Sequence, residues 1–204
     1  MSKAIFLGSF NPPHKGHYSA VKSVIDFFQV NDEHKFDKIH IIPCWQNPNK
    51  SKSIDFYDRY RMCKYEFASL SDNCLVDDIE AIMKPTYTYE LIDYFKANKD
   101  KLIGPDFWWI ITEETFKELI DRKWKESERL LNENKFIIIT KDEVDVYISE
   151  YCKKNDINRI FVPLDGNFDV HSTQIRENFW VNAKYDSCIT KDTKEYIVEH
   201  NLYK

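Results

Sequence analysis

Two histidines near the start of the chain are spaced so that they could act together on a phosphate group. His14 and His17 lie three residues apart in the segment G-S-F-N-P-P-H-K-G-H (residues 8–17). An apolar run over residues 3–8 precedes them and a helical pattern follows, so both imidazoles can face one point at a helix start. Proteins bind phosphate at such a position, because backbone N–H groups point at the ligand. Two imidazoles there could stabilise the charge that develops in phosphoryl transfer.

Other residues of the same segment suit the close approach of a nucleotide. The chain has only four glycines, and two of them, Gly8 and Gly16, leave room here for a ligand. The backbone N–H groups of Ser9 and Phe10 could hold phosphate oxygens. Asn11 opens a stiff turn with the two prolines that follow it. An H-x-x-H pair can also bind a metal, but the spacing places no third ligand, so we expect no metal ligands in the chain.

The segment resembles the signature of the HxGH nucleotidyltransferases, and residues 8–17 are called the HxGH loop below. It is most similar to the pattern of the nicotinate and nicotinamide mononucleotide adenylyltransferases, G-G-x-F-(D/N)-P-x-H-x-G-H. The resemblance implies a Rossmann-like fold and transfer of AMP from ATP to a pyridine mononucleotide, with release of pyrophosphate, in NAD biosynthesis. It implies that His14 and His17 are catalytic, that the loop binds ATP, that Asn11 contacts the acceptor, and that Mg²⁺ arrives with ATP.

A second set of phosphate-binding groups lies in the segment V-H-S-T-Q-I-R (170–176). Hydroxyl and N–H groups at a helix start suit a polyphosphate, and Arg176 adds a forked cation. A helix cap followed by a surface arginine is the structural alternative. The segment resembles the family's ATP-phosphate motif, I-S-S-T-x-I-R, with His171 in place of the first serine. The resemblance assigns Ser172, Thr173 and Arg176 to the β- and γ-phosphates of ATP, and Arg176 to catalysis as well.

The loop P-C-W-Q-N-P-N-K-S-K (43–52) is polar and basic and follows a predicted strand. Lys50 could neutralise a substrate phosphate there, and a solvated loop is the alternative. The loop resembles the family's P-x-K sequence, in which the lysine contacts the mononucleotide phosphate. Arg59 and Met62 fit the R-x-x-M helix that follows it in the family, and we expect their role to be mainly structural.

Two further features resemble the part of the family that binds the pyridine ring. The segment T-Y-T-Y-E-L-I (86–92) is similar to S-Y-T-x-D-T-L, which holds the pyridine substituent through backbone groups. This similarity implicates Thr86, Tyr87 and Thr88, although an ordinary helix cap fits them equally well. Trp124 lies among basic residues and could stack on a flat ring, as a tryptophan of the family does, or be a partly buried surface residue.

The chain departs from the family after its fourth predicted strand. The family usually has G-A-D there, and this chain has Thr112, Glu113 and Glu114. A side chain at Thr112 would crowd a site that the family's backbone approaches closely. Glu114 could keep the acidic role with a longer reach, and we include it among the substrate-binding residues.

The elements that must position these residues alternate along the chain. Short apolar runs predict strands at residues 3–8, 38–43, 74–77, 107–111, 136–140 and 159–162. Helical spacing of apolar residues predicts helices at 20–28, 57–70, 87–95, 113–120, 143–153, 173–180 and 190–200. Residues 121–134 fit a helix, a loop or both. The pattern predicts an α/β fold: a Rossmann-like, doubly wound parallel sheet of the nucleotidyltransferase type, with helices on both faces and residues 1–204 in a single domain.

Composition narrows the partners and the compartment. The chain of 204 residues has a formal charge of −5, which argues against nucleic acid as a partner. No apolar run approaches the roughly 18 residues of a membrane helix, and no secretory signal is recognisable, so we expect no membrane partner. Five widely spaced cysteines without a C-x-x-C pair fit reduced thiols in the cytoplasm. The expected partners are ATP and a pyridine mononucleotide, and a homo-oligomer is compatible with the sequence.

Two alternatives to this function stay open. The chain could be another HxGH nucleotidyltransferase, for instance one that acts on phosphopantetheine. It could also be a catalytically silent nucleotide-binding sensor, for which Thr112 and its two glutamate neighbours are the only support. The sequence leaves the choice between nicotinate and nicotinamide open as well.

Overall fold

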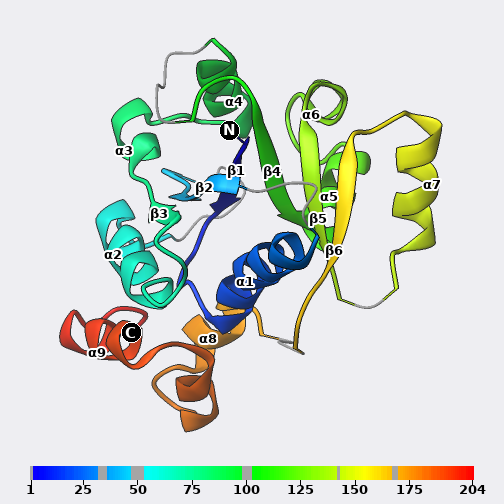
Figure 1. Cartoon of the computed structure of the whole chain (residues 1–204). Coiled ribbons are helices and arrows are strands. Elements are labelled where there is room, and N and C mark those ends of the chain that lie inside the picture. Colours follow the sequence, from blue (N-terminus) through cyan, green and yellow to red (C-terminus); the bar gives the residue numbers. More distant parts are fainter. Residues whose placement is uncertain (1, 32–35, 47–52, 98–102, 142, 167–169) are drawn as a thin grey trace.

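The strands form one parallel sheet with the strand order of a doubly wound α/β fold (Figure 1). The computed structural model describes residues 2–31, 36–46, 53–97, 103–141, 143–166 and 170–204. In this part of the chain six strands pair in the order β3-β2-β1-β4-β5-β6, each parallel to its neighbours. They are β1 (Ser2–Gly8), β2 (Phe36–Pro43), β3 (Cys74–Val76), β4 (Phe107–Thr112), β5 (Lys135–Thr140) and β6 (Arg159–Pro163). The predicted fold class is confirmed.

The order of the strands turns back between β1 and β4, which places a crevice at their carboxyl ends. Phe6 of β1 lies opposite Ile41 of β2 on one side and Ile110 of β4 on the other. The connections after β1 and β4 leave the sheet toward different faces, and ligands of such sheets bind between them. The HxGH loop and Thr112 both lie at this edge.

The helices of the described residues follow the predicted pattern closely. They are α1 (Lys15–Val30), α2 (Phe56–Glu66), α3 (Ile79–Met83), α4 (Thr88–Lys96), α5 (Glu113–Ile120), α6 (Ser127–Glu133), α7 (Val146–Lys154), α8 (Ser172–Asn178), the 3₁₀ helix η1 (Ala183–Cys188) and α9 (Lys191–Glu199). None of them is both long enough and apolar enough to cross a lipid bilayer.

Both faces of the sheet are buried, which explains why its strands are apolar throughout. Alternate residues of β1 point to opposite faces, with Ile5 in one apolar cluster and Ala4 and Phe6 in another. Helices α4, α5, α6 and α7 cover the first face, and α1 and α2 cover the second. A third cluster joins α2 to α8 and α9 through Met62, Ile175 and Ile197. Figure 1 shows α8 and α9 together below the sheet.

Three local predictions need correction or completion. Helix α2 ends at Glu66 rather than residue 70, and turns follow it. Helix α3 and η1 were not predicted, because elements of five and six residues are too short to show helical periodicity. Residues 121–134 are a turn followed by α6, so both of the open alternatives apply there.

Candidate active site

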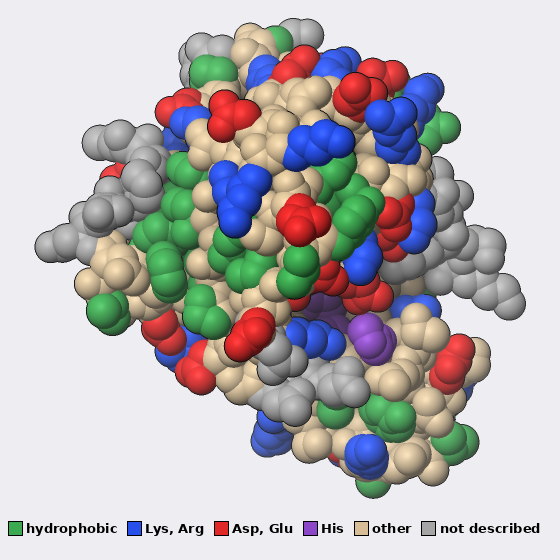
Figure 2. Space-filling model, turned by 90° about the vertical axis from the view of Figure 1, so that its right-hand side faces the viewer, with side chains coloured by type: hydrophobic (Ala, Val, Ile, Leu, Met, Phe, Trp, Pro, Cys, Tyr) green, Lys and Arg blue, Asp and Glu red, His purple; other side chains and the backbone are tan. Residues whose placement is uncertain are grey.

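A single large cleft brings the predicted site residues together. It has a volume of about 1060 Å³ and lies at the carboxyl ends of β1, β2, β4 and β5. Lys50 belongs to residues 47–52, which are outside the described part of the chain. Every other predicted site residue lines the cleft: Gly8, Ser9, Phe10, Asn11, His14, Gly16, His17, Thr86, Tyr87, Thr88, Glu114, Trp124, Ser172, Thr173 and Arg176. Figure 2 shows histidine side chains at the bottom of the hollow, with acidic side chains above them and a basic one beside them.

The start of the HxGH loop is shaped by the ring of Phe10. This side chain is 1% exposed and contacts Phe6, His17 and Phe67 edge-on, and its backbone has a φ of +43°. A Cβ at Gly8 would lie 2.8 Å from the Phe10 ring. Gly8 is therefore required for the packing of Phe10, which is a different reason from the ligand approach that we expected. Both residues still line the cleft.

His14 and His17 cap the first helix and face each other. The backbone N–H of His14 donates to Nδ1 of His17, and the N–H of Gly16 donates to Nδ1 of His14, both at 3.2 Å. Since each Nδ1 accepts, the neutral rings carry their protons on Nε2. The two ring centroids are 3.8 Å apart. The loop thus presents two adjacent N–H donors, the arrangement that could stabilise an anionic phosphoryl group.

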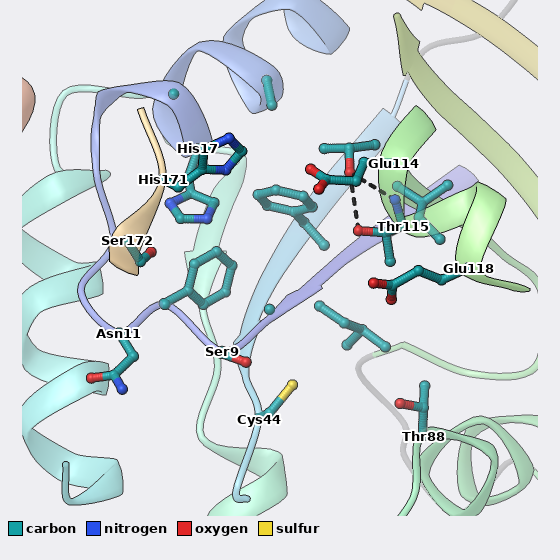
Figure 3. A pocket seen from close by; sticks show the side chains of 18 of the residues that line it. Ser9, Asn11, His17, Cys44, Thr88, Glu114, Thr115, Glu118, His171 and Ser172 are labelled. Atoms are coloured by element: carbon teal, nitrogen blue, oxygen red, sulfur yellow. Dashed lines mark hydrogen bonds between the residues drawn. The ribbon is translucent and has the colours of Figure 1, made fainter. Parts of the chain in front are cut away.

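Burial keeps the His14 ring neutral at ordinary pH. The side chain is 5% exposed, and burial, followed by the nearby His171, lowers the pKa of His14 to about 4. His171 is the residue before α8, and Figure 3 shows it beside His17 in the cleft. The sequence showed His171 only as a replaced serine and did not predict that a third imidazole would lie near the pair.

Helix α8 is attached to the HxGH loop by the residues predicted to bind ATP. The Ser172 hydroxyl donates to the carbonyl of Pro12 at 2.8 Å. The Arg176 guanidinium donates to the carbonyl of Asn11 at 2.6 Å and to the Thr173 hydroxyl at 3.0 Å. A guanidinium has five N–H donors, so Arg176 can hold the loop and a phosphate oxygen at the same time.

Asn11 is engaged by a residue that the sequence did not single out. Its side-chain oxygen accepts a hydrogen bond of 2.9 Å from the Tyr203 hydroxyl, and Asn11 is 5% exposed. The amide is therefore held from the side of α9, and this bond gives Asn11 a role in fixing the loop in addition to its predicted contact with the acceptor. No sequence pattern marks Tyr203, because it lies beyond the last predicted helix.

The residues predicted to recognise the pyridine ring lie on the other side of the cleft, and the helix start there is already capped. The Glu90 carboxylate accepts from the backbone N–H groups of Thr86, at 2.8 Å, and Tyr87, at 3.4 Å. The expected capture of a pyridine substituent by these two N–H groups would have to displace Glu90. Thr88, the first residue of α4, lines the cleft without that competition from Glu90 (Figure 3).

Trp124 is fixed between the core and the cleft. Its indole N–H donates to the Glu118 carboxylate at 2.9 Å, and its ring centroid is 6.1 Å from that of the buried Trp109. Both tryptophans line the cleft. The packing against Trp109 makes one part of the indole structural and leaves another part at the cleft, so it combines the two alternatives that the sequence left open.

Thr112, Glu113 and Glu114, which stand in place of the family's G-A-D sequence, all line the cleft. Thr112 caps α5, accepting from the N–H of Thr115, and its side chain lines the cleft. Glu113 accepts the N–H of Asp145 at 3.1 Å. In Figure 3, Glu114 lies across the cleft from His17. Within the described segments no group of three or more His, Cys, Asp or Glu side chains could hold a metal ion.

Comparison with known proteins identifies the family of the chain. The model of the cytidylyltransferase-like family matches residues 5–178. Two curated relatives are both named probable nicotinate-nucleotide adenylyltransferase. The relative from Caldicellulosiruptor bescii is 26% identical over 100% of each chain, and the relative from Clostridium tetani is 28% identical over 99% of this chain and 98% of its own.

The fold is also found in a solved structure of Plasmodium falciparum nicotinic acid mononucleotide adenylyltransferase complexed with NaAD. The TM-score is 0.74 at 22% identity, over 99% of this chain and 97% of that one. The match over almost the whole chain supports the fold, and the family model covers both segments that are predicted to bind phosphate, from the HxGH loop to Arg176. The chain belongs to the cytidylyltransferase-like family.

Proposed function

We propose that this chain transfers the adenylyl group of ATP to a pyridine mononucleotide and releases pyrophosphate. One observation carries the proposal: a single cleft joins the paired imidazoles, the start of α8 with Arg176, and the aromatic side that contains Tyr87 and Trp124. The groups that we assign to ATP and those that we assign to a flat aromatic acceptor thus line the same cleft. The names of the two relatives favour nicotinate mononucleotide as the acceptor.

The chemistry that fits the cleft is direct in-line displacement. The 5′-phosphate of the acceptor attacks the α-phosphorus of ATP, the bond to the β-phosphate breaks, and pyrophosphate leaves. His14 and His17 accept backbone N–H groups at Nδ1, and their Nε2–H groups would stabilise the negative charge on the transferring group. Arg176 and the α8 start would hold the departing phosphates. The rate then comes from positioning and charge stabilisation, without a covalent enzyme intermediate.

Mg²⁺ fits this site as a companion of ATP rather than as an ion held by the chain. When bound, it neutralises phosphate charge. Since the described segments offer no cluster of three metal-ligating side chains, the phosphates themselves would supply most of its ligands. Glu114, which lines the cleft across from His17, is our candidate among its acidic side chains to bind a water of such an ion.

The acceptor would lie between the HxGH loop and the α4 start. Thr88 and Trp124 line that side, and Lys50 is our candidate for the acceptor phosphate. Trp124 is held by Glu118 and Trp109, so its ring is pre-oriented for stacking. All five cysteines lie in the described part of the chain and none of them is in a disulfide, and we propose a cytoplasmic enzyme.

The test is pyrophosphate release from Mg-ATP with three acceptors: nicotinate mononucleotide, nicotinamide mononucleotide and phosphopantetheine. We expect release with a pyridine mononucleotide, and the ratio of the two rates identifies the preferred one. Release with phosphopantetheine alone would replace the acceptor and keep the reaction type.

The sensor alternative keeps one observation in its favour, the Thr112 side chain in the cleft. Folded protein that binds ATP but releases no pyrophosphate with any of the three acceptors would support it. The variant Thr112→Gly would then be the first to assay, since it restores the residue type usual in the family.

A further inference from the structure

Two buried ionisable side chains hold the backbone of Trp45 from its two ends. The Arg59 guanidinium donates through Nη2 to the Trp45 carbonyl at 2.9 Å. The Glu80 carboxylate accepts the Trp45 N–H. Arg59 is 1% exposed and Glu80 is 3% exposed. We call Arg59, Trp45 and Glu80 the Trp45 brace.

The brace also reaches the HxGH loop. Nη1 of Arg59 donates to the carbonyl of Ser9 at 2.8 Å, and Nε donates to the carbonyl of Ile54 at 3.3 Å. The three nitrogens of one guanidinium thus bind carbonyls of three separate segments. Because the guanidinium is planar and rigid, it fixes the distance between the HxGH loop and the backbone at Trp45.

Trp45 lies where the chain leaves β2 for the loop that contains Lys50. The N–H of the preceding residue, Cys44, donates to the carbonyl of Gly8 at 2.9 Å. The indole is fixed as well, with the ring of Phe56 at 5.6 Å and the Lys84 ammonium at 4.9 Å. The residues before and after Trp45 in the sequence both line the cleft; they are Cys44 and Gln46.

Burying the two charges is costly, which argues that they do more than stabilise the fold. Burial raises the pKa of Glu80 to about 7, against the opposing effects of the Trp45 N–H and of Arg59. Burial also lowers the pKa of Arg59. Apolar residues of similar volume often stabilise a protein as well as buried ionic groups do. In this protein the two side chains instead bind backbone groups of Trp45 and Ser9, which is an arrangement suited to positioning the backbone beside the cleft.

We propose that Arg59 and Glu80 are positioning residues that hold residues 44–46, which border the cleft, in register with the HxGH loop. The proposal rests on the proposed function, in which the acceptor lies between the HxGH loop and the start of α4, where Cys44 lines the cleft (Figure 3). Glu80 positions Trp45 through the hydrogen bond that its oxygen accepts from the Trp45 N–H, and this bond does not require Glu80 to be charged. Arg59 acts on both loops.

Two substitutions at Glu80 separate its reach from its charge. E80D keeps the charge and withdraws the carboxylate from Trp45, whereas E80Q keeps an oxygen at the same distance and removes the charge. We expect E80D to raise the KM for the pyridine mononucleotide about tenfold and to leave the KM for ATP within about twofold, as the loss of one hydrogen bond allows. E80Q should retain the mononucleotide KM of the wild type. Unchanged KM in E80D, or a larger rise in E80Q than in E80D, overturns the proposal.

Glu66 supplies a matched control. It is also 1% exposed, burial also raises the pKa of its carboxyl group, and it accepts hydrogen bonds from Thr190 and Thr193 at the start of α9. E66D should lower the thermal stability and leave the mononucleotide KM unchanged. An equal rise of that KM in E66D and E80D would mean general loosening of the fold and would contradict a specific role for Glu80.

Amide hydrogen exchange over residues 44–46 tests the brace without reference to turnover. Exchange should be faster in E80D than in the wild type and in E80Q, and equal rates in all three overturn the proposal. If the wild type releases no pyrophosphate with either pyridine mononucleotide while exchange behaves as expected, the proposed function fails and the brace stands. Should E80D not fold, R59K replaces it: a lysine ammonium lacks the planar fork that binds the carbonyls of Ser9, Ile54 and Trp45 in fixed positions, so exchange over 44–46 should again accelerate.

Discussion

At the scale of single residues, the imidazole pair has a structural task as well as the chemical one that we propose for it. His17 accepts the backbone N–H of His14 and so closes the capping box of α1. Each Nδ1 is occupied in this way, and this leaves Nε2–H as the group that can meet a phosphate. The two tasks can be separated by experiment, because loss of a helix cap costs about 1 kcal/mol of stability, whereas loss of a transition-state donor costs turnover.

We predict that His17→Ala lowers kcat for pyrophosphate release by about 10²-fold or more, as expected for a donor to the transition state. The free energy of unfolding should fall by about 1 kcal/mol, the contribution of a cap. Asp145→Ala is the matched control, because Asp145 caps α7 by accepting from Tyr147 and Ile148. This control should lose similar stability and keep its turnover. A folded His17→Ala protein with the kcat of the wild type would exclude the catalytic role.

The buried state of His14 predicts a dependence of stability on pH. The pKa of His14 is lowered to about 4 in the folded protein, from 6.5 in an unfolded chain. Protons therefore bind the unfolded state more tightly, so the contribution of neutral His14 is fully present above pH 6.5 and is lost as the pH falls from 6.5 to 4. The loss should reach roughly 2 kcal/mol at pH 5.

Urea unfolding of the wild type and of His14→Asn at pH 7 and pH 5 measures this loss. Asparagine is a good helix cap and does not titrate, so the wild type should lose more stability between the two pH values than the variant does. Equal losses would show that His14 titrates normally in the folded protein.

At the scale of elements, side chains from three other parts of the chain form hydrogen bonds with the HxGH loop. Arg59 of α2 binds it at Ser9, Arg176 of α8 binds it at Asn11, and Tyr203 after α9 binds the Asn11 side chain. These contacts join residues 50 to 192 positions apart in the sequence. The geometry of the loop is therefore set by tertiary structure and not by the loop alone.

Tyr203 allows a test of this long-range support. We predict that Tyr203→Phe, which removes only the hydroxyl bonded to Asn11, lowers kcat about three- to tenfold, since a neutral hydrogen bond contributes about 1 kcal/mol. Tyr196→Phe is the matched control, because its hydroxyl donates to Asp58 of α2 and does not contact the loop. Equal thermal stability with lower kcat only in Tyr203→Phe is the expected result. Equal kcat in both variants would mean that Asn11 keeps its position without Tyr203.

The elements also show how far the sequence could predict the fold and the site. The strands were predicted because each is a short apolar run, buried on both faces of a parallel sheet. The position of the HxGH loop and of Ser172 followed from their places after strands. Glu80 was not predicted because α3 is too short to show periodicity, and Glu90 was missed as a competitor for the N–H groups of Thr86 and Tyr87 because capping geometry is decided in three dimensions.

At the scale of the whole molecule, the cleft has contributions from both halves of the sheet and from the helices that follow it. The HxGH loop extends from β1, Thr112 ends β4, and Arg176 belongs to α8, which packs against α2 and α9 in the third apolar cluster. Binding of ATP across these parts should stabilise the folded state. At 100 times its Kd, a ligand adds about 2.7 kcal/mol.

A cavity in the third apolar cluster should therefore weaken ATP binding, whereas a cavity in the core around α7 should not. Ile175 of α8 is 0% exposed and lies one residue before Arg176, whereas Ile148 of α7 is 1% exposed and packs in the cluster on the other side of the sheet. Ile175→Ala and Ile148→Ala should each lose about 2–5 kcal/mol of stability, because both leave a cavity in a packed core.

Only Ile175→Ala should also weaken ATP binding, measured by calorimetry at a temperature where both variants are folded. A cavity at Ile175 lets α8 shift and moves Arg176 away from the HxGH loop, while a cavity at Ile148 leaves that contact intact. Equal ATP affinity in the two variants would show that α8 is positioned by its hydrogen bonds to the HxGH loop alone and not by the apolar cluster beneath it.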